Sequence, residues 1–136
     1  MFPRGRKLLL GVSGGISAYK SCELLRRLQD VGFIVDVVPT SASLNFVGLA
    51  TWEALSGRKV LTDLWSEVEK VPHISMAKEN DLIVIAPTTA DLLAKLASGR
   101  ADDLLTNIVL ASTAPKILVP AMHTEMWLNP ATVANV

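Results

Sequence analysis

The apolar stretch LIVIA at residues 82–86, which is followed at once by Pro87, is the clearest indication of the fold. A short, continuous apolar run predicts a strand that is buried on both faces, as in a parallel sheet. Further strands are expected at residues 7–12 (KLLLGV), 34–38 (IVDVV) and 116–119 (KILV), with helical spacing between them. The sequence therefore predicts an α/β fold built on a doubly wound parallel sheet.

The expected helices fall between these strands. The spacing of apolar residues predicts helices at 17–31, 44–55, 73–79, 90–97 and 103–112, and a further helix that starts at Asn129-Pro130. Residues 59–61 are expected to form a short strand or an extended connection. No internal repeat or linker interrupts the pattern, so residues 1–136 are expected to form one domain.

The overall composition limits the classes of function. The 13 basic and 13 acidic residues balance, which gives no support for binding to nucleic acid or to an anionic membrane. No apolar run approaches the roughly 20 residues of a membrane-spanning helix. The single cysteine, Cys22, is expected to pack in the first helix, and a chain without disulfides fits a cytoplasmic location. The apolar excess predicts burial against other subunits.

Small and hydroxyl-bearing residues follow the carboxyl ends of the predicted strands, where doubly wound sheets bind their ligands. These segments are 13–17 (SGGIS), 40–43 (TSAS), 86–91 (APTTAD) and 120–123 (PAMH). Backbone N–H groups and hydroxyls at helix N-termini suit an anionic ligand. The candidate cofactor-binding residues are Gly14, Gly15, Ile16, Ser17, Thr40, Ser41, Ser43, Ala86, Thr88, Thr89, Ala90, Asp91 and Ala121.

The ligand expected at these strand ends is a monophosphate cofactor. The first loop lacks the full G-x-G-x-x-G pattern, and residues 39–41 contain no acidic side chain to hold a ribose, as a dinucleotide requires. The P-loop pattern fails as well, because Tyr19 stands where that motif has glycine. FMN therefore fits better than FAD or NAD. For the first loop alone, a tight turn at Gly14 and Gly15 without any ligand is the alternative.

The two histidines are candidates for proton transfer near neutral pH. His73 opens a predicted helix, and on its chemistry alone a structural role is the more frequent one. His123 follows a strand end, where a functional role is as frequent as a structural one. The neighbouring Met122, Met126 and Trp127 either pack in the core or form the wall of a pocket. No metal site is expected.

Five segments together resemble one family. They are residues 11–20 (GVSGGISAYK), 73–74 (HI), 86–91 (APTTAD), 101–106 (ADDLLT) and 120–127 (PAMHTEMW). On these segments the sequence resembles the homo-oligomeric flavin-containing cysteine decarboxylases, in particular the phosphopantothenoylcysteine decarboxylases of coenzyme A biosynthesis. The resemblance implies a three-layer, flavodoxin-like or Rossmann-like fold, bound FMN, and assembly as a trimer or a multiple of trimers.

The resemblance also implies roles for individual residues. It implies that His73 is the active-site histidine, and that residues 120–127 form part of the substrate site. His123 stands where the family has an asparagine that contacts the substrate carboxylate, and an imidazole can also donate hydrogen bonds to a carboxylate. His123 and Met126 are therefore expected to bind substrate. The implied reaction is the FMN-dependent decarboxylation of 4′-phosphopantothenoylcysteine to 4′-phosphopantetheine.

One feature of the family is expected to lie outside this sequence. The decarboxylases carry a substrate clamp with a reactive cysteine, C-terminal to the segment 120–127. The FMN-binding domain at residues 1–136 is therefore expected to be truncated before that clamp. Two other functions stay open. A flavin prenyltransferase is disfavoured by the segment 120–127 and by His73. A non-catalytic FMN-binding subunit stays open because the clamp is expected to lie outside this sequence.

Overall fold

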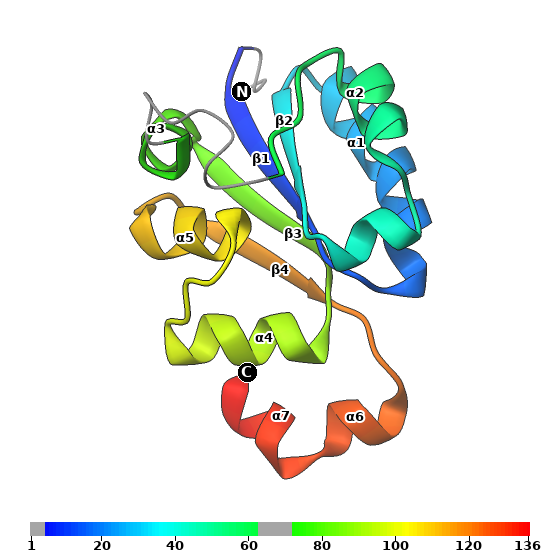
Figure 1. Ribbon diagram of the computed structural model, residues 1–136, viewed down its shortest axis with the longest axis vertical. Coiled ribbons are helices and arrows are strands. Elements are labelled where there is room, and N and C mark those ends of the chain that lie inside the picture. Colours follow the sequence, from blue (N-terminus) through cyan, green and yellow to red (C-terminus); the bar gives the residue numbers. More distant parts are fainter. Residues whose placement is uncertain (1–4, 63–71) are drawn as a thin grey trace.

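Four parallel strands form the centre of the part of the chain that the structure describes (Figure 1). The structure is a computed structural model that describes residues 5–62 and 72–136, without the side chains of 72–74. The strands are β1 (Lys7–Val12), β2 (Ile34–Pro39), β3 (Leu82–Thr88) and β4 (Lys116–Pro120). Their order across the sheet is β2-β1-β3-β4. Because β2 and β3 lie on opposite sides of β1, the topological switch point falls between β1 and β3.

Helices cover both faces of the sheet, which confirms the predicted doubly wound α/β fold (Figure 1). The helical segments are η1 (Ile16–Tyr19), α1 (Lys20–Asp30), η2 (Ala42–Asn45), α2 (Leu49–Ser56), α3 (Pro72–Glu79), α4 (Ala90–Ser98), α5 (Leu104–Ala111), α6 (Thr124–Leu128) and α7 (Pro130–Asn135). Helices α1 and α2 contribute to the core on one face. Helices α3, α4 and α5 contribute to the core on the other face.

Strand β1 shows why these strands are continuous apolar runs. Successive side chains of a strand point to opposite faces. Leu8 and Leu10 accordingly pack in the core under α1 and α2, whereas Leu9 packs in the core under α3, α4 and α5. All three are fully buried, and each such side chain contributes about 1.5–3 kcal/mol through the apolar area removed from water.

Several details differ from the sequence-based expectations. The predicted helices at 17–31 and 44–55 are each divided into a 3₁₀ turn and an α-helix, and α6 was not expected. Of the two alternatives for residues 59–61, the structure shows a connection and no strand. Strand β3 continues through Pro87 to Thr88, and the Ala86–Pro87 peptide is cis. The pairing of β3 with β4 is irregular between Ile85 and Thr88. A proline is tolerated there because no regular ladder hydrogen bond is lost.

Strand β4 contradicts the expectation that every strand is buried on both faces. Leu118 is partly buried against the core under α3, α4 and α5. The alternate side chains Ile117 and Val119 are 51% and 45% exposed. An outer position alone is not the reason, because β2 is the other outer strand and is mostly buried. No residue of β4 belongs to the core under α1 and α2, so the face of β4 that carries Ile117 and Val119 is left partly uncovered. A local apolar run reports the character of a strand but not its place in the sheet.

Cys22 has the packing role predicted for it. It is partly buried on α1 and packs against the core on that face of the sheet. Burial raises the pKa of its thiol, so the reactive thiolate is disfavoured. None of the helices in the described ranges combines the length and the apolar character needed to cross a bilayer.

Candidate functional site: a hollow at the switch point

A hollow of about 460 Å³ opens at the carboxyl edge of the sheet. The loops after β1, β3 and β4 form it, and its volume lies in the range of small-molecule and cofactor sites. It is lined by Gly14, Gly15, Ile16, Ser17, Thr89, Ala90, Ala121, Met122, His123 and Met126. The structure thus brings together predicted cofactor and substrate residues from three separate segments, at the place where doubly wound sheets bind ligands.

Two helical N-termini meet at this hollow. Segment η1, which leads directly into α1, starts at Ile16, and α4 starts at Ala90. The hydroxyl of Thr89 caps α4 by accepting the N–H of Leu92 at 3.2 Å. The N–H groups of Ala90 and Asp91 belong to the first turn and have no intrahelical acceptor. Such amides, together with the helix dipole, favour a negatively charged group such as a phosphate.

The two adjacent glycines of the first loop have different surroundings. A Cβ on Gly14 would lie 2.5 Å from the Cβ of Ala42, so the loop after β1 can approach η2 this closely only with glycine. A Cβ on Gly15 would meet no atom closer than Cγ of Pro87 at 3.5 Å, which is an ordinary contact. Both glycines line the hollow, but only Gly14 is required for the close packing of the loop after β1 against η2.

Ser13 is a site residue that the sequence analysis did not single out. It directly follows β1 and is 2% exposed. Its hydroxyl donates to the carbonyl of Pro87 at 2.5 Å and accepts the N–H of Thr89 at 3.1 Å. The side chain therefore connects two of the loops that form the hollow. The available signal was a hydroxyl residue placed directly after a buried strand at the switch point.

Some predicted cofactor residues lie near the hollow without lining it. Ser43 and Thr88 are fully buried, and their hydroxyls donate to the carbonyls of Thr40 and Ile85 at 2.7 and 2.8 Å. Both hydroxyls therefore form their hydrogen bonds within their own segments of the chain. The other predicted residues outside the lining are Thr40, Ser41, Ala86 and Asp91. A binding role for this group stays a prediction.

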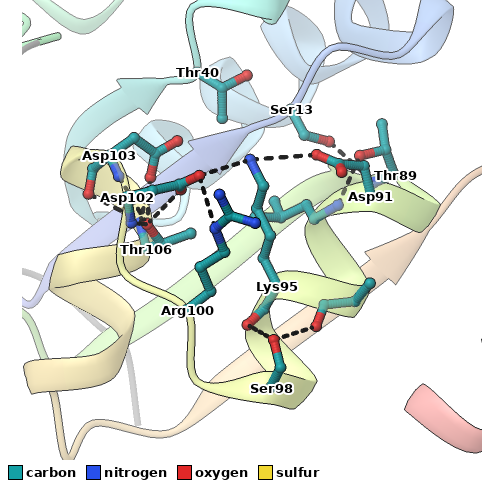
Figure 2. A network of polar contacts seen from close by, with 12 residues as sticks. Ser13, Thr40, Thr89, Asp91, Lys95, Ser98, Arg100, Asp102, Asp103 and Thr106 are labelled. Atoms are coloured by element: carbon teal, nitrogen blue, oxygen red, sulfur yellow. Dashed lines mark hydrogen bonds and ion pairs between the residues drawn. The ribbon is translucent and has the colours of Figure 1, made fainter.

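Asp91 belongs to a network of ion pairs that connects the start of α4 with the segment between α4 and α5 (Figure 2). Lys95 Nζ lies 3.4 Å from Asp91 Oδ2 and 3.3 Å from Asp102 Oδ2, and Arg100 Nε lies 3.2 Å from Asp102 Oδ2. Desolvation disfavours the charged form of Lys95, but Asp102 and Asp91 outweigh it and raise the pKa of the ammonium. Desolvation also opposes ionisation of Asp102, yet Lys95 and Arg100 lower its pKa.

The segment between β4 and α6 forms the remaining wall. His123 is the N-terminal residue flanking α6 and is exposed at the hollow, and Met122 and Met126 contribute apolar surface. Trp127 is 42% exposed and lines a separate hollow of about 360 Å³ with Pro120, Ala121 and Met122. Met122 and Met126 are thus wall residues of the larger hollow.

His73 lies in the first turn of α3, and its side chain is outside the described residues. Helix α3 packs against α5. In Figure 1, α3 lies beside the starts of the strands, whereas α6 lies beyond their carboxyl ends. The described residues therefore do not connect His73 with the hollow, and its catalytic role stays a prediction.

The fold and the hollow define a doubly wound α/β protein with a candidate ligand site at its switch point. The chain belongs to the Flavoprotein family, whose model matches residues 3–136. The coenzyme A biosynthesis bifunctional protein CoaBC of Mycobacterium tuberculosis is 54% identical over 131 residues, which are 96% of this chain and 31% of that protein. CoaBC of Vibrio cholerae is 47% identical over 133 residues, 96% of this chain and 33% of that protein. The chain thus spans about a third of the length of these curated relatives.

Solved structures agree with this family membership. The FMN-dependent cysteine decarboxylase SpaF matches with a TM-score of 0.91 and 33% identity, covering 96% of this chain and 77% of that one. A PPC decarboxylase mutant complexed with pantothenoylaminoethenethiol matches with a TM-score of 0.85 and 34% identity, covering 97% and 75%. The family resemblance inferred from the sequence motifs is therefore confirmed.

Proposed function

We propose that this chain binds FMN and decarboxylates 4′-phosphopantothenoylcysteine to 4′-phosphopantetheine in coenzyme A biosynthesis. The observation that carries the proposal is the hollow at the switch point, where helical N-termini and an apolar wall face the same space. The relatives support the choice of substrate, since the bifunctional proteins are coenzyme A biosynthesis proteins and a solved neighbour is a PPC decarboxylase.

The residues at the hollow fit FMN. The amides at the starts of η1 and α4 suit its phosphate, and the hydroxyls of Ser17 and Thr89 can add hydrogen bonds. The side chains of Met122 and Met126 suit a flat aromatic ring, because thioethers pack well against aromatic groups. Bound FMN would supply the two-electron redox chemistry at the cysteine end of the substrate.

The protein itself must bind and orient the substrate. We assign His123 to the substrate carboxylate, because its exposed imidazole lies at the hollow and can donate hydrogen bonds to an anion. Met126 follows on α6 and would pack beside the same group. His73 would handle a proton during the reaction, in agreement with its match to the family motif.

The proposal includes self-association and a cytoplasmic location. Half-exposed Ile117 and Val119 on β4, together with exposed Ile16 and Tyr19, provide apolar surface that a second subunit would cover. A trimer, or a multiple of trimers, agrees with the family resemblance. Sedimentation of the flavin-loaded protein should show a multimer. A monomer with stoichiometric flavin would contradict this part of the proposal.

The decisive experiment combines cofactor identification with single turnover. Cofactor released by heat should be FMN by chromatography. Anaerobic mixing with phosphopantothenoylcysteine should bleach the visible flavin absorbance and release carbon dioxide, and His123→Leu should bind FMN but bleach far more slowly. Recovery of a dinucleotide would contradict the cofactor assignment. FMN binding without bleaching would indicate a non-catalytic subunit, and consumption of dimethylallyl phosphate with reduced flavin would indicate a prenyltransferase.

A further inference from the structure

Ser13 joins two loops that lie far apart in the sequence. Its hydroxyl accepts the N–H of Thr89, 76 residues further along the chain (Figure 2). The same hydroxyl donates to the carbonyl of Pro87, 74 residues further along, and the N–H of Ser13 donates to that carbonyl at 3.3 Å. The side chain is 2% exposed and is not among the residues that line the hollow. Both hydrogen-bonding functions of the hydroxyl are thus used within the protein.

These bonds lie where the backbone pairing of the sheet has ended. The register between β1 and β3 runs as far as Gly11 opposite Ile85. Beyond that pair, the hydrogen-bond ladder no longer fixes the distance between the segments that follow β1 and β3. Ser13 holds these two segments together instead, because its hydroxyl and its amide both form hydrogen bonds to the segment that leads into α4.

Ser13 also forms hydrogen bonds directly before the starts of both helical segments. The carbonyl of Ser13 accepts the N–H of Gly15 at 2.9 Å, directly before η1 starts. Its hydroxyl occupies the N–H of Thr89, so the first amides of α4 without an intrahelical acceptor are those of Ala90 and Asp91. A phosphate bound by both sets of amides would depend on the distance between them.

We propose that Ser13 is a positioning residue: its hydroxyl holds the N-termini of η1 and α4 at the spacing that accepts a phosphate, without contacting the ligand. The inference rests on the proposed FMN site and adds the residue that sets its geometry. Because the isoalloxazine ring would contact other parts of the hollow, loss of the Ser13 hydroxyl should weaken the binding of the phosphate and leave the binding of the ring unchanged.

Ser21 provides a matched control on the neighbouring helix. It is 4% exposed, and its hydroxyl donates to the carbonyl of Ala86 at 2.6 Å, one residue before the Pro87 carbonyl that Ser13 uses. Ser21 does not line the 460 Å³ hollow. Removing its hydroxyl therefore deletes a buried hydrogen bond to the same strand but leaves the bond to the start of α4 in place.

The test compares FMN with riboflavin, which lacks the phosphate. Dissociation constants for both flavins would be measured by fluorescence quenching for the wild type, Ser13→Ala and Ser21→Ala, and denaturant unfolding of each protein without flavin would give its stability. Both variants should lose similar stability. Only Ser13→Ala should lose preference for FMN over riboflavin, by about tenfold, because misplaced amides bind the phosphate less well. The phosphorus NMR resonance of bound FMN should shift in that variant alone.

An unchanged FMN-to-riboflavin ratio in Ser13→Ala, or an equal change in Ser21→Ala, would overturn the inference while leaving the proposed function standing. If the wild type bound neither flavin, the proposed function and the inference would fail together. Should Ser13→Ala not fold, Ser13→Cys allows the same comparison, since it keeps a similar volume and only a weak donor. The preference of Ser13→Cys for FMN over riboflavin should be weaker than that of the wild type but not absent. A preference equal to that of the wild type would contradict the proposal.

Discussion

Gly14 and Ala42 lie so close together that a Cβ on the glycine would be 2.5 Å from the Cβ of the alanine. The contact joins the loop after β1 to η2, which follows β2. Beside it, the N–H of Thr40 donates to the carbonyl of Val12 at 2.9 Å, so backbone pairing reinforces the approach. The carboxyl ends of β1 and β2 therefore form one closely packed unit next to the hollow.

Gly14→Ala should destabilise the protein by about 1–3 kcal/mol, because the backbone of η2 must move to accept the added methyl group. Gly15→Ala is the matched control in the same loop. Its added Cβ would make only ordinary contacts, at 3.5 Å or more, and should change the free energy of unfolding by less than about 0.5 kcal/mol. Denaturant unfolding without flavin measures the free energy of unfolding of both variants. A loss for Gly14→Ala as small as that for Gly15→Ala would show that the loop moves to accept the methyl group at little cost.

The network around Lys95 should make stability depend on pH. The pKa of Asp102 is lowered, so its contribution is complete above the ordinary aspartate value of about 4 and is lost as the pH falls through the lowered pKa. The pKa of Lys95 is raised, so its contribution is present below the ordinary value of about 10.4 and is lost as the pH rises through the raised pKa. Lys95→Met should therefore cost most near neutral pH.

The measurement is the difference in unfolding free energy between the wild type and Lys95→Met at several pH values. The difference should shrink in acid below about pH 4, and added salt should reduce it at neutral pH, because these groups are partly exposed. Lys78→Met, at an exposed position on α3, should give a flat profile. If the difference for Lys95→Met does not vary with pH, the loss of stability comes from packing of the aliphatic part of the lysine side chain and not from its charge.

Replacement of His123 should separate substrate binding from cofactor binding. His123→Asn supplies an amide that can also donate to a carboxylate, and should retain turnover within about tenfold. His123→Leu replaces the imidazole with an apolar side chain that has no hydrogen-bond donor. It should raise KM for phosphopantothenoylcysteine by about tenfold or more while FMN affinity stays the same. Full activity in the leucine variant would remove His123 from the substrate site.

His73→Asn tests the assignment that depends on the family motif. The variant should bind FMN as the wild type does, because His73 lies in α3 and outside the loops after β1, β3 and β4. Decarboxylation should fall by at least about a hundredfold, the usual contribution of a proton-transferring group. Single-turnover bleaching together with carbon dioxide release measures the loss. Loss of flavin from the variant, or full activity, would show that the assigned role is wrong.

The sequence by itself was sufficient to predict the order of the strands and of the helices other than α6, and the edge of the sheet where the hollow lies. The apolar runs at residues 8–12 and 82–86 indicate burial on two faces, because successive side chains of a strand point to opposite faces and those in these runs are apolar. Gly57 and Gly99 end α2 and α4 in the left-handed conformation, which glycine adopts at little cost. Such signals are local, so they can be recognised without knowing what packs against them.

Only the tertiary structure decided which side chains face the hollow and which support it. Ser13 and Ser17 belong to the same short segment, yet one is buried between two loops and the other lines the hollow. The exposure of Ile117 likewise depends on packing between segments, because no residue of β4 belongs to the core under α1 and α2. The physical reason is the same in each case: the deciding partners lie on other segments of the chain, and a pattern along the sequence carries no information about which distant groups meet.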